Sequence, residues 1–196
     1  MIAVVLIKFT IVPLPMSAAQ KFGEAVYFFN RMRETACNLR SFPYNLSAFL
    51  SALRSITFYL QEQFSKDPAF EVWYAGKQHE LRNDPLLKRL KDTRDEALHA
   101  RPVQLAVFAG PQLPEEGLAM ESGGSLSLTD DAEGNVVTTY QTGPEQPEVS
   151  VPPVVIWKFD DPEELDVVAA CGQGLTKLRA LLDEWHQLRT RQSTTT

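Results

Sequence analysis

The sequence predicts a mainly α-helical protein, an antiparallel helical bundle with a small antiparallel β insertion before its C-terminal helix. Apolar residues recur at helical spacing through residues 17–100 and again through residues 161–192. Between these stretches, in residues 103–159, apolar and polar residues alternate as they do in half-buried strands. We therefore expect one discontinuous helical domain, residues 17–100 plus 161–192, interrupted by a β-rich insertion at residues 103–159.

Residues 1–15 are expected to form an apolar N-terminal strand or extension. The segment is too short to span a bilayer, Lys8 interrupts it and no basic segment precedes it, so it fits a signal peptide poorly. A buried β-strand over residues 2–12, stopped by Pro13, fits better. Met16 offers an alternative start, in which case the residues before it are dispensable.

Helical spacing predicts a first helix over Ser17–Leu39, ended by the sequence Ser41-Phe42-Pro43. The second helix has the clearest apolar stripe, along Leu46–Phe64. Three later helices are each expected to begin at an Asp-Pro pair, because Asp caps free amide groups and Pro at the first helical position loses no hydrogen bond. These pairs are Asp67-Pro68, Asp84-Pro85 and Asp161-Pro162. In the last helix, Gly172 and Gly174 are expected points of close approach to a neighbour.

The insertion is expected to contain four strands. They are Val103–Ala109, Ser125–Thr129, Val136–Gln141 and Val154–Phe159. Residues 130–135 contain Gly134-Asn135 and suit a hairpin connection between the second and third strands. The connections 110–124 and 142–153 are rich in Pro, Gly and Glu, and we expect them to be loosely packed.

The composition argues against several classes of function. A net charge of −6 argues against a protein that coats nucleic acid non-specifically, although it is compatible with a local basic groove. Cys37 and Cys171 are too few for a disulfide framework or a four-thiolate zinc site, and their apolar neighbours favour free thiols in a reducing cytoplasm. The sequence has no phosphate loop, dinucleotide fingerprint or hydrolase elbow. We expect no cofactor, no bound metal, no membrane association and a cytoplasmic location.

Two groups of side chains have both a functional and a structural interpretation. His79 and Glu80, near Asp84, supply part of a metal site, but a solvated helix end is the simpler interpretation because metal sites need three or more ligands. Trp73 and Tyr74 are able to stack on a nucleic-acid base. Aromatic residues at helical spacing more often belong to a core, and we expect this here.

Arg94 is the most informative residue because it lies where the pattern calls for an apolar one. The expected buried stripe of the helix after Asp84-Pro85 consists of Leu87, Leu90, Arg94, Ala97 and Leu98. Burying an unpaired charge costs on the order of several kcal/mol or more. Arg94 is therefore expected to meet a carboxylate, a helix end, a second subunit or a phosphate-bearing ligand.

Arg94 and His99 belong to an R-x4-H sequence, Arg94-Asp95-Glu96-Ala97-Leu98-His99, near the end of a helix. A helical bundle with this sequence resembles the HEPN family of nucleotide- and RNA-associated domains, whose R-x4-6-H motif usually has a polar residue directly after the Arg. Asp95 fits that position. The resemblance covers residues 17–99 and the C-terminal helix from Asp161, but not the β insertion.

The resemblance implies a homodimer in which two copies of the motif face each other and build one RNA-cleaving site, in a toxin or defence setting. Arg94 and His99 lie about 140° apart on an ideal helix, so a second subunit or an unwound helix end must bring them together. An antitoxin or another regulatory protein is a further expected partner. Family members paired with nucleotidyltransferase antitoxins often carry Tyr two residues after the His, and this chain departs from that pattern with Arg101.

The motif suits a metal-independent cleavage in which the RNA 2′-hydroxyl attacks the adjacent phosphate. His99 transfers a proton near neutral pH, and Arg94 stabilises the developing phosphorane charge. Asp95, four residues before His99, orients the imidazole ring. The candidate substrate-binding residues are Lys88, Lys91 and Arg101. The alternative is a non-catalytic HEPN-like module that binds a partner or ligand, with Arg94 in an ion pair to a neighbouring helix and His99 facing the helix dipole.

Overall fold

The computed structural model describes residues 17–99, 103–112, 122–160, 163 and 165–194. The helices are α1 (Ala18–Glu34), α2 (Ser41–Phe64), α3 (Pro68–Asn83), α4 (Pro85–His99) and α5 (Val167–Thr194). The strands are β1 (Leu105–Pro111), β2 (Ser125–Asp130), β3 (Val136–Gln141), β4 (Val149–Val151) and β5 (Pro153–Phe159). The prediction of a mainly helical protein with a small antiparallel β region is confirmed. The expected strand over residues 2–12 lies outside the described residues.

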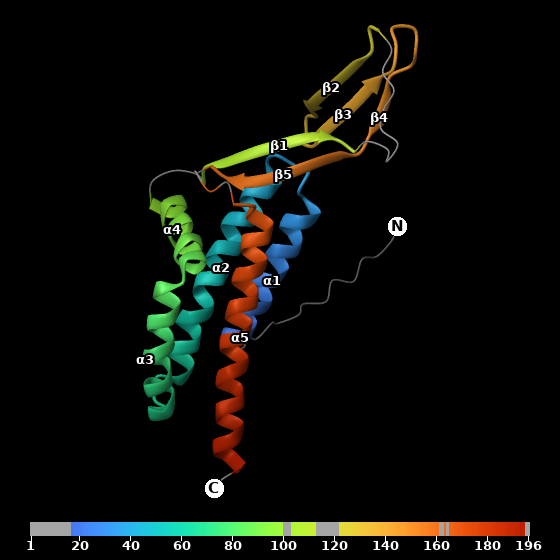
Figure 1. The fold of residues 1–196 in the computed structure, drawn as a ribbon. Coiled ribbons are helices and arrows are strands. Elements are labelled where there is room, and N and C mark those ends of the chain that lie inside the picture. The colour runs from blue at the N-terminus through green and yellow to red at the C-terminus, as the bar shows by residue number, and fades with distance from the viewer. Residues whose placement is uncertain (1–16, 100–102, 113–121, 161–162, 164, 195–196) are drawn as a thin grey trace, which may run out of the picture.

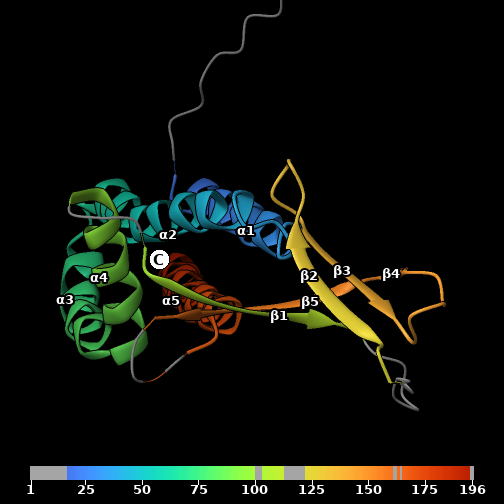
Figure 2. The same ribbon diagram turned by 90° about the horizontal axis from the view of Figure 1, so that it is seen from above.

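The helices pack side by side, and α3 and α4 follow one another along one flank of the bundle (Figures 1 and 2). α1 and α2 form an antiparallel hairpin, and α5 packs against α1, α2 and α4. The antiparallel pair β1–β5 crosses the end of the bundle where α4 ends and α5 begins (Figure 1). The three-stranded antiparallel sheet, in the order β2-β3-β4, extends away from the helices beyond this pair.

The predicted helix starts at Ser17, Asp67-Pro68 and Asp84-Pro85 are correct. The expected break at Ser41-Phe42-Pro43 is instead the first turn of α2, where a proline is tolerated. Ser17 and Gln20 form a reciprocal capping box at the start of α1. The Asp67 carboxylate accepts hydrogen bonds from two amide groups of the first turn of α3, and Pro68 occupies the first helical position. Asp84 accepts from the Leu87 amide at the start of α4.

The last helix, α5, begins at Val167, later than the expected start at Asp161-Pro162, a pair that itself lies outside the described residues. The Asp166 carboxylate caps α5 by accepting a hydrogen bond from the Ala169 amide at 2.7 Å. Just before this cap the backbone is tied to β5, since the Phe159 amide donates to the Leu165 carbonyl. A backbone that pairs with a strand cannot also continue a helix.

The first helix ends at Glu34, five residues before the expected Leu39. The backbone that follows pairs with the β2–β3 hairpin instead, through a bond from the Leu39 amide to the Gly134 carbonyl and one from the Val136 amide to the Cys37 carbonyl. Gly134 has φ +86°, a left-handed conformation that favours glycine, and its Cα faces the Arg40 side chain. The hairpin therefore fixes the turn between α1 and α2.

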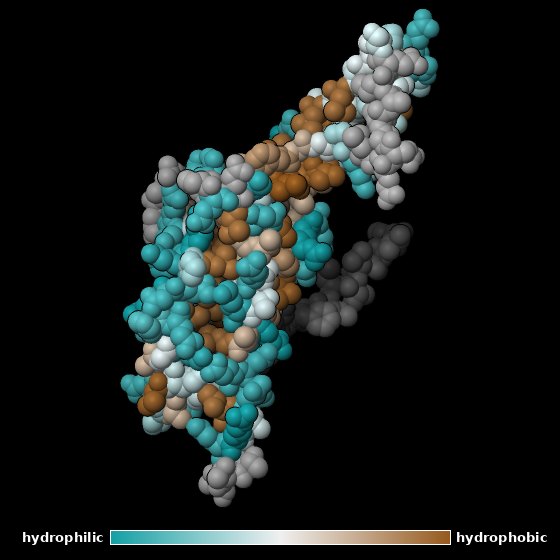
Figure 3. Space-filling model, in the orientation of Figure 1, coloured by the Kyte–Doolittle hydropathy of each residue, from teal (hydrophilic) through white to brown (hydrophobic). Residues whose placement is uncertain are grey.

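All four predicted strands are present, and their boundaries agree to within two residues. Exposed apolar side chains lie along the β1–β5 pair where it leaves the bundle, among them Phe108, Val154 and Ile156 (Figure 3). We call these three residues the apolar arm face. The short strand β4 was not predicted, because it lies in a connection rich in Pro and Glu. It pairs with β3 through Val151, whose carbonyl also accepts from the Thr138 hydroxyl.

Trp157 of β5 fastens the β region to the helical bundle. Its ring stacks on Phe42 of α2 with a centroid distance of 4.3 Å and an interplanar angle of 5°. Its indole Nε1 donates to the Ala36 carbonyl at 2.7 Å. Phe42 and Trp157 are both buried, so this contact joins the sheet to the core that α1, α2 and α5 share.

We predict that Trp157→Ala lowers the free energy of unfolding by about 3–5 kcal/mol, because it removes a buried ring and leaves a cavity. Trp157→Phe keeps the stacking and loses the hydrogen bond to Ala36, so it should cost about 1 kcal/mol. Urea unfolding followed by far-ultraviolet circular dichroism measures both values. Equal losses for the two variants would show that the stacking on Phe42 does not hold the sheet in place.

Candidate functional site

One residue, Asp84, forms the corner between α3 and α4. Its backbone amide donates to the Glu80 carbonyl at the end of α3, and its side chain caps α4. Its carboxylate also binds the Lys177 ammonium of α5. Burial opposes ionisation of Asp84, but the Lys177 ammonium and the Leu87 amide outweigh it and hold the pKa below the usual 3.8. Asp84 thus sets both the start of α4 and its tie to α5.

Gly174 allows α4 to approach α5 closely. A Cβ atom at this position would lie 2.7 Å from Leu90 Cδ1 and 3.5 Å from Leu53 Cδ2. Leu90 is 2 % exposed and Leu53 is 5 % exposed, so α2, α4 and α5 meet at this point. The expectation for Gly174 is confirmed, and a Cβ atom at Gly172 would similarly lie 3.3 Å from the Phe29 ring.

Arg94 lies at the edge of the buried face of α4, not at its centre. Thr93, three residues after Leu90, takes the buried position and is 8 % exposed, whereas the Arg94 side chain is 30 % exposed. Its Nη1 donates to Asp95 at 2.9 Å, while its Nε is buried and has no hydrogen-bond partner among the described residues. The partner of Arg94 is therefore the neighbouring carboxylate of its own helix.

Asp95 is shared between two cations of α4. Besides Arg94, it binds the Lys91 ammonium at 2.9 Å. These two contacts, the Lys91 hydrogen bond first, lower the pKa of Asp95. In the described structure, the Asp95 carboxylate thus forms ion pairs with both Lys91 and Arg94. The backbone of His99 ends α4, whereas its side chain and Arg101 lie outside the described residues, so the expected contact between Asp95 and the imidazole stays a prediction.

Lys88, Lys91 and Arg94 recur every three residues along α4 and form one row on the helix surface. The row leads toward the C-terminal end of α4, where His99 is the last helical residue. Lys88 and Lys91 also line a pocket, so this row connects the Arg94–His99 motif with the pocket.

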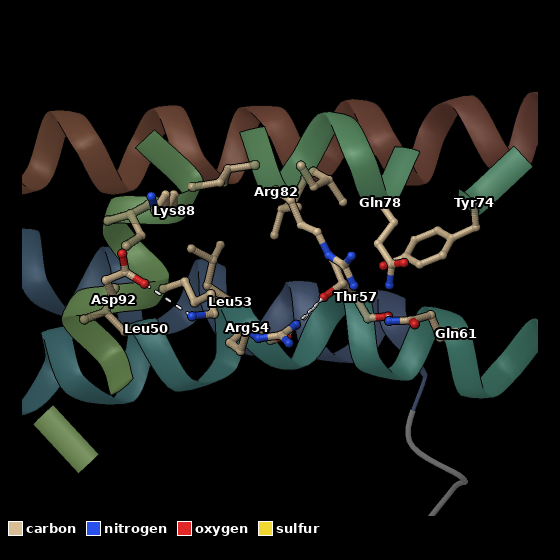
Figure 4. Close-up of a pocket in the computed structure, with 15 residues that line it drawn as sticks. Leu50, Leu53, Arg54, Thr57, Gln61, Tyr74, Gln78, Arg82, Lys88 and Asp92 are labelled. Atoms are coloured by element: carbon tan, nitrogen blue, oxygen red, sulfur yellow. Dashed lines mark hydrogen bonds and ion pairs between the residues drawn. The ribbon is translucent and has the colours of Figure 1, made fainter. Parts of the chain in front are cut away.

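The pocket lies between α2, α5 and the corner formed by α3 and α4, and has a volume of about 430 Å³. Figure 4 shows its polar side chains converging from α2, α3 and α4. The polar and charged residues that line it are Arg54, Thr57, Gln61, Tyr74, Gln78, Arg82, Lys88, Lys91 and Asp92. The sequence predicted ligand-binding roles for Lys88 and Lys91 and considered Tyr74 as a base-stacking or core residue, whereas Asp92 and the other polar lining residues of α2 and α3 were not predicted. The available signal was the polar series Arg54, Thr57 and Gln61, which recurs at helical spacing in α2.

The structural interpretation of Trp73 and Tyr74 as core residues is favoured. Tyr74 is 7 % exposed, and Trp73 stacks on Trp185 and donates its indole N–H to Glu184 at 2.9 Å. In the described part of the chain no cluster of His, Cys, Asp and Glu could hold a metal ion. Cys171 is a buried free thiol whose pKa is raised by burial, while Cys37 is a half-buried free thiol. Over the same residues no helix is long and apolar enough to cross a bilayer.

The fold and the pocket define this protein as a helical bundle that carries a small β region and a pocket lined by cations. Residues 13–106 match the model of a family described as bacteriophage lambda protein ea47. The match spans α1 to α4 and ends at the start of β1, so it includes the whole Arg94–His99 motif. No curated protein and no solved structure matches this chain. The similarity to the phage family names no reaction or ligand.

We predict that Asp84→Asn, which retains a capping side chain, lowers the free energy of unfolding at neutral pH by about 0.5–1 kcal/mol through loss of the Lys177 pair. Because the folded-state pKa of Asp84 is lowered, this stability is present above pH 3.8 and disappears as the pH falls through the folded-state pKa. Urea unfolding at pH 7 and in strong acid measures the difference.

The control is Lys177→Met, which should cost about the same as Asp84→Asn and add little in the double variant. A gap between wild type and Asp84→Asn that stays constant down to low pH would contradict the role given to the Asp84 carboxylate.

Proposed function

We propose that this protein is a metal-independent endoribonuclease of the HEPN type that acts as a homodimer, in a toxin or defence setting. The observation that carries the proposal is the row of cations Lys88, Lys91 and Arg94, which leads to His99 at the end of α4. Such a row suits a phosphate backbone, and the histidine at its end supplies the proton-transfer group that cleavage needs.

The reaction uses the chemistry of the RNA itself. The 2′-hydroxyl loses its proton and attacks the adjacent phosphorus, and the 5′-oxygen leaves with a proton, which gives a 2′,3′-cyclic phosphate. In the proposed dimer, the neutral His99 of one copy accepts the proton of the 2′-hydroxyl, and the protonated His99 of the second copy donates a proton to the leaving 5′-oxygen. The exposed part of the Arg94 guanidinium stabilises the phosphorane oxygens.

The ion pair between Arg94 and Asp95 shows which interaction an RNA phosphate must replace when it binds. In the single chain, Asp95 neutralises part of the charge of Arg94 and Lys91. A phosphate that binds this row has to compete with Asp95 for both cations. In the proposed dimer, the second copy of the motif supplies the facing Arg94 and His99, which one helix does not bring together by itself.

The second candidate function is a non-catalytic HEPN-like module that binds a ligand or partner, such as a regulatory protein. The ion pair between Arg94 and Asp95 within one helix favours it, since it satisfies the guanidinium without RNA. The two candidates make opposite predictions for the purified protein.

We predict that the wild-type protein cleaves a mixed RNA pool in EDTA and leaves 2′,3′-cyclic phosphate ends. His99→Ala and Arg94→Ala should each reduce the cleavage rate by about 100-fold or more. The matched control is His186→Ala, because His186 is an exposed histidine of α5 far along the chain from the motif, and it should cleave as wild type does. Gel electrophoresis of end-labelled RNA measures the rates.

Analytical ultracentrifugation of the same samples tests the dimer. A strict monomer at assay concentration, or cleavage that survives both motif substitutions, would reject the nuclease in this form. Absence of cleavage by wild type would favour the non-catalytic module.

A further inference from the structure

We propose that the pocket between α2, α5 and the α3–α4 corner binds a small amphipathic anion, an organic acid with one anionic head and an apolar body. This inference goes beyond RNA cleavage and does not rest on it, because the residues that distinguish the pocket come from α2 and α3. Neither helix contributes to the Arg94–His99 motif.

The inner wall of the pocket is made of leucine side chains from four helices. They are Leu50 and Leu53 of α2, Leu81 of α3, Leu87 and Leu90 of α4, and Leu178 of α5. Among these, Leu50, Leu53, Leu90 and Leu178 belong to the buried core, so the wall is fixed by the fold. A pocket of about 430 Å³ lies in the range of small-molecule sites, and an apolar wall favours an apolar ligand body.

A small polar cluster stands beside this wall. The Arg54 guanidinium donates to the Thr57 hydroxyl at 2.9 Å, and the buried Tyr74 lines the same pocket. Burial raises the pKa of Tyr74 above its usual 10.0, against the Thr57 side chain and the charges of Arg54 and Arg82. Both guanidinium groups therefore act on the buried phenol, and Figure 4 shows Arg82 reaching from α3 toward Thr57.

The charge of the lining is strongly one-sided. Its four cations are Arg54, Arg82, Lys88 and Lys91, and its one carboxylate is Asp92. Asp92 is bound by Lys91 at 3.2 Å. Within the described residues, no carboxylate forms an ion pair with Arg54, Arg82 or Lys88. Three cations from three helices thus border an apolar wall without an ion-pair partner among the described residues, and this arrangement suits an anionic head attached to an apolar body.

The probe for this site is 8-anilinonaphthalene-1-sulfonate, which joins a sulfonate to an aromatic body and fluoresces when bound. We expect saturable binding to the wild-type protein. Decanoate, kept well below its micelle concentration, should displace the dye. Decanol lacks the charge and inorganic phosphate lacks the apolar body, so neither should compete at the same concentration.

Arg82→Glu should weaken dye binding by about tenfold or more, because it replaces a cation of the lining with an anion. The matched control is Lys66→Glu, which makes the same charge change at an exposed residue outside the pocket and should alter the affinity less than about twofold. Gln78→Trp fills the pocket without changing the charge and should also abolish binding. His99→Ala should bind as wild type does, which separates this site from the nuclease proposal.

Dye that binds Arg82→Glu and Gln78→Trp as tightly as wild type would overturn the proposal. Loss of the fluorescence in Ile156→Ser would overturn it as well, because the dye would then sit on the apolar arm face. Circular dichroism spectra and melting temperatures of each variant establish that the chain is folded before its affinity is compared.

Discussion

The close approach of α4 to α5 at Gly174 fixes how the α4 backbone lies against α2 and α5. Leu90 fills the space that a side chain at position 174 would take, and Leu53 of α2 completes the contact. Asp84 fixes the beginning of the same helix through its cap and its pair with Lys177. α4 is thereby held at two points, and its charged residues are presented in a fixed direction.

Both proposed activities use this one helix, at neighbouring stretches of the same row of cations. Toward the corner with α3, Lys88 and Lys91 border the leucine-walled pocket. Toward the C-terminal end, Arg94 and Asp95 form a pair beside the last turn, which ends at His99. Lys91 connects the two regions because it binds Asp92 of the pocket and Asp95 of the motif.

Periodicity and capping chemistry predicted most of the fold, because these signals are local. The last helix begins later than the expected start at Asp161-Pro162 because the residues just before α5 pair with β5. A local sequence pattern does not reveal such a contact between two segments. Arg94 was placed in the buried stripe, whereas Thr93 takes that position and Asp95 holds the guanidinium at the edge. The pocket could not be predicted because Arg54 and Arg82 converge only when α2 and α3 are packed. Each of them alone resembles an ordinary exposed cation.

If α4, held against α2 and α5, creates a binding pocket for an apolar anion, the leucines of that pocket must sense the bound molecule. Methyl NMR of leucine-labelled protein during titration with 8-anilinonaphthalene-1-sulfonate detects this contact, since ring currents shift nearby methyl groups. We expect shifts for Leu53, Leu81 and Leu87, which line the pocket, and none for Leu126 and Leu128 of the distant strand β2. Shifts confined to the β2 leucines, or saturable binding without any shift of the pocket leucines, would show that the pocket is not the binding site.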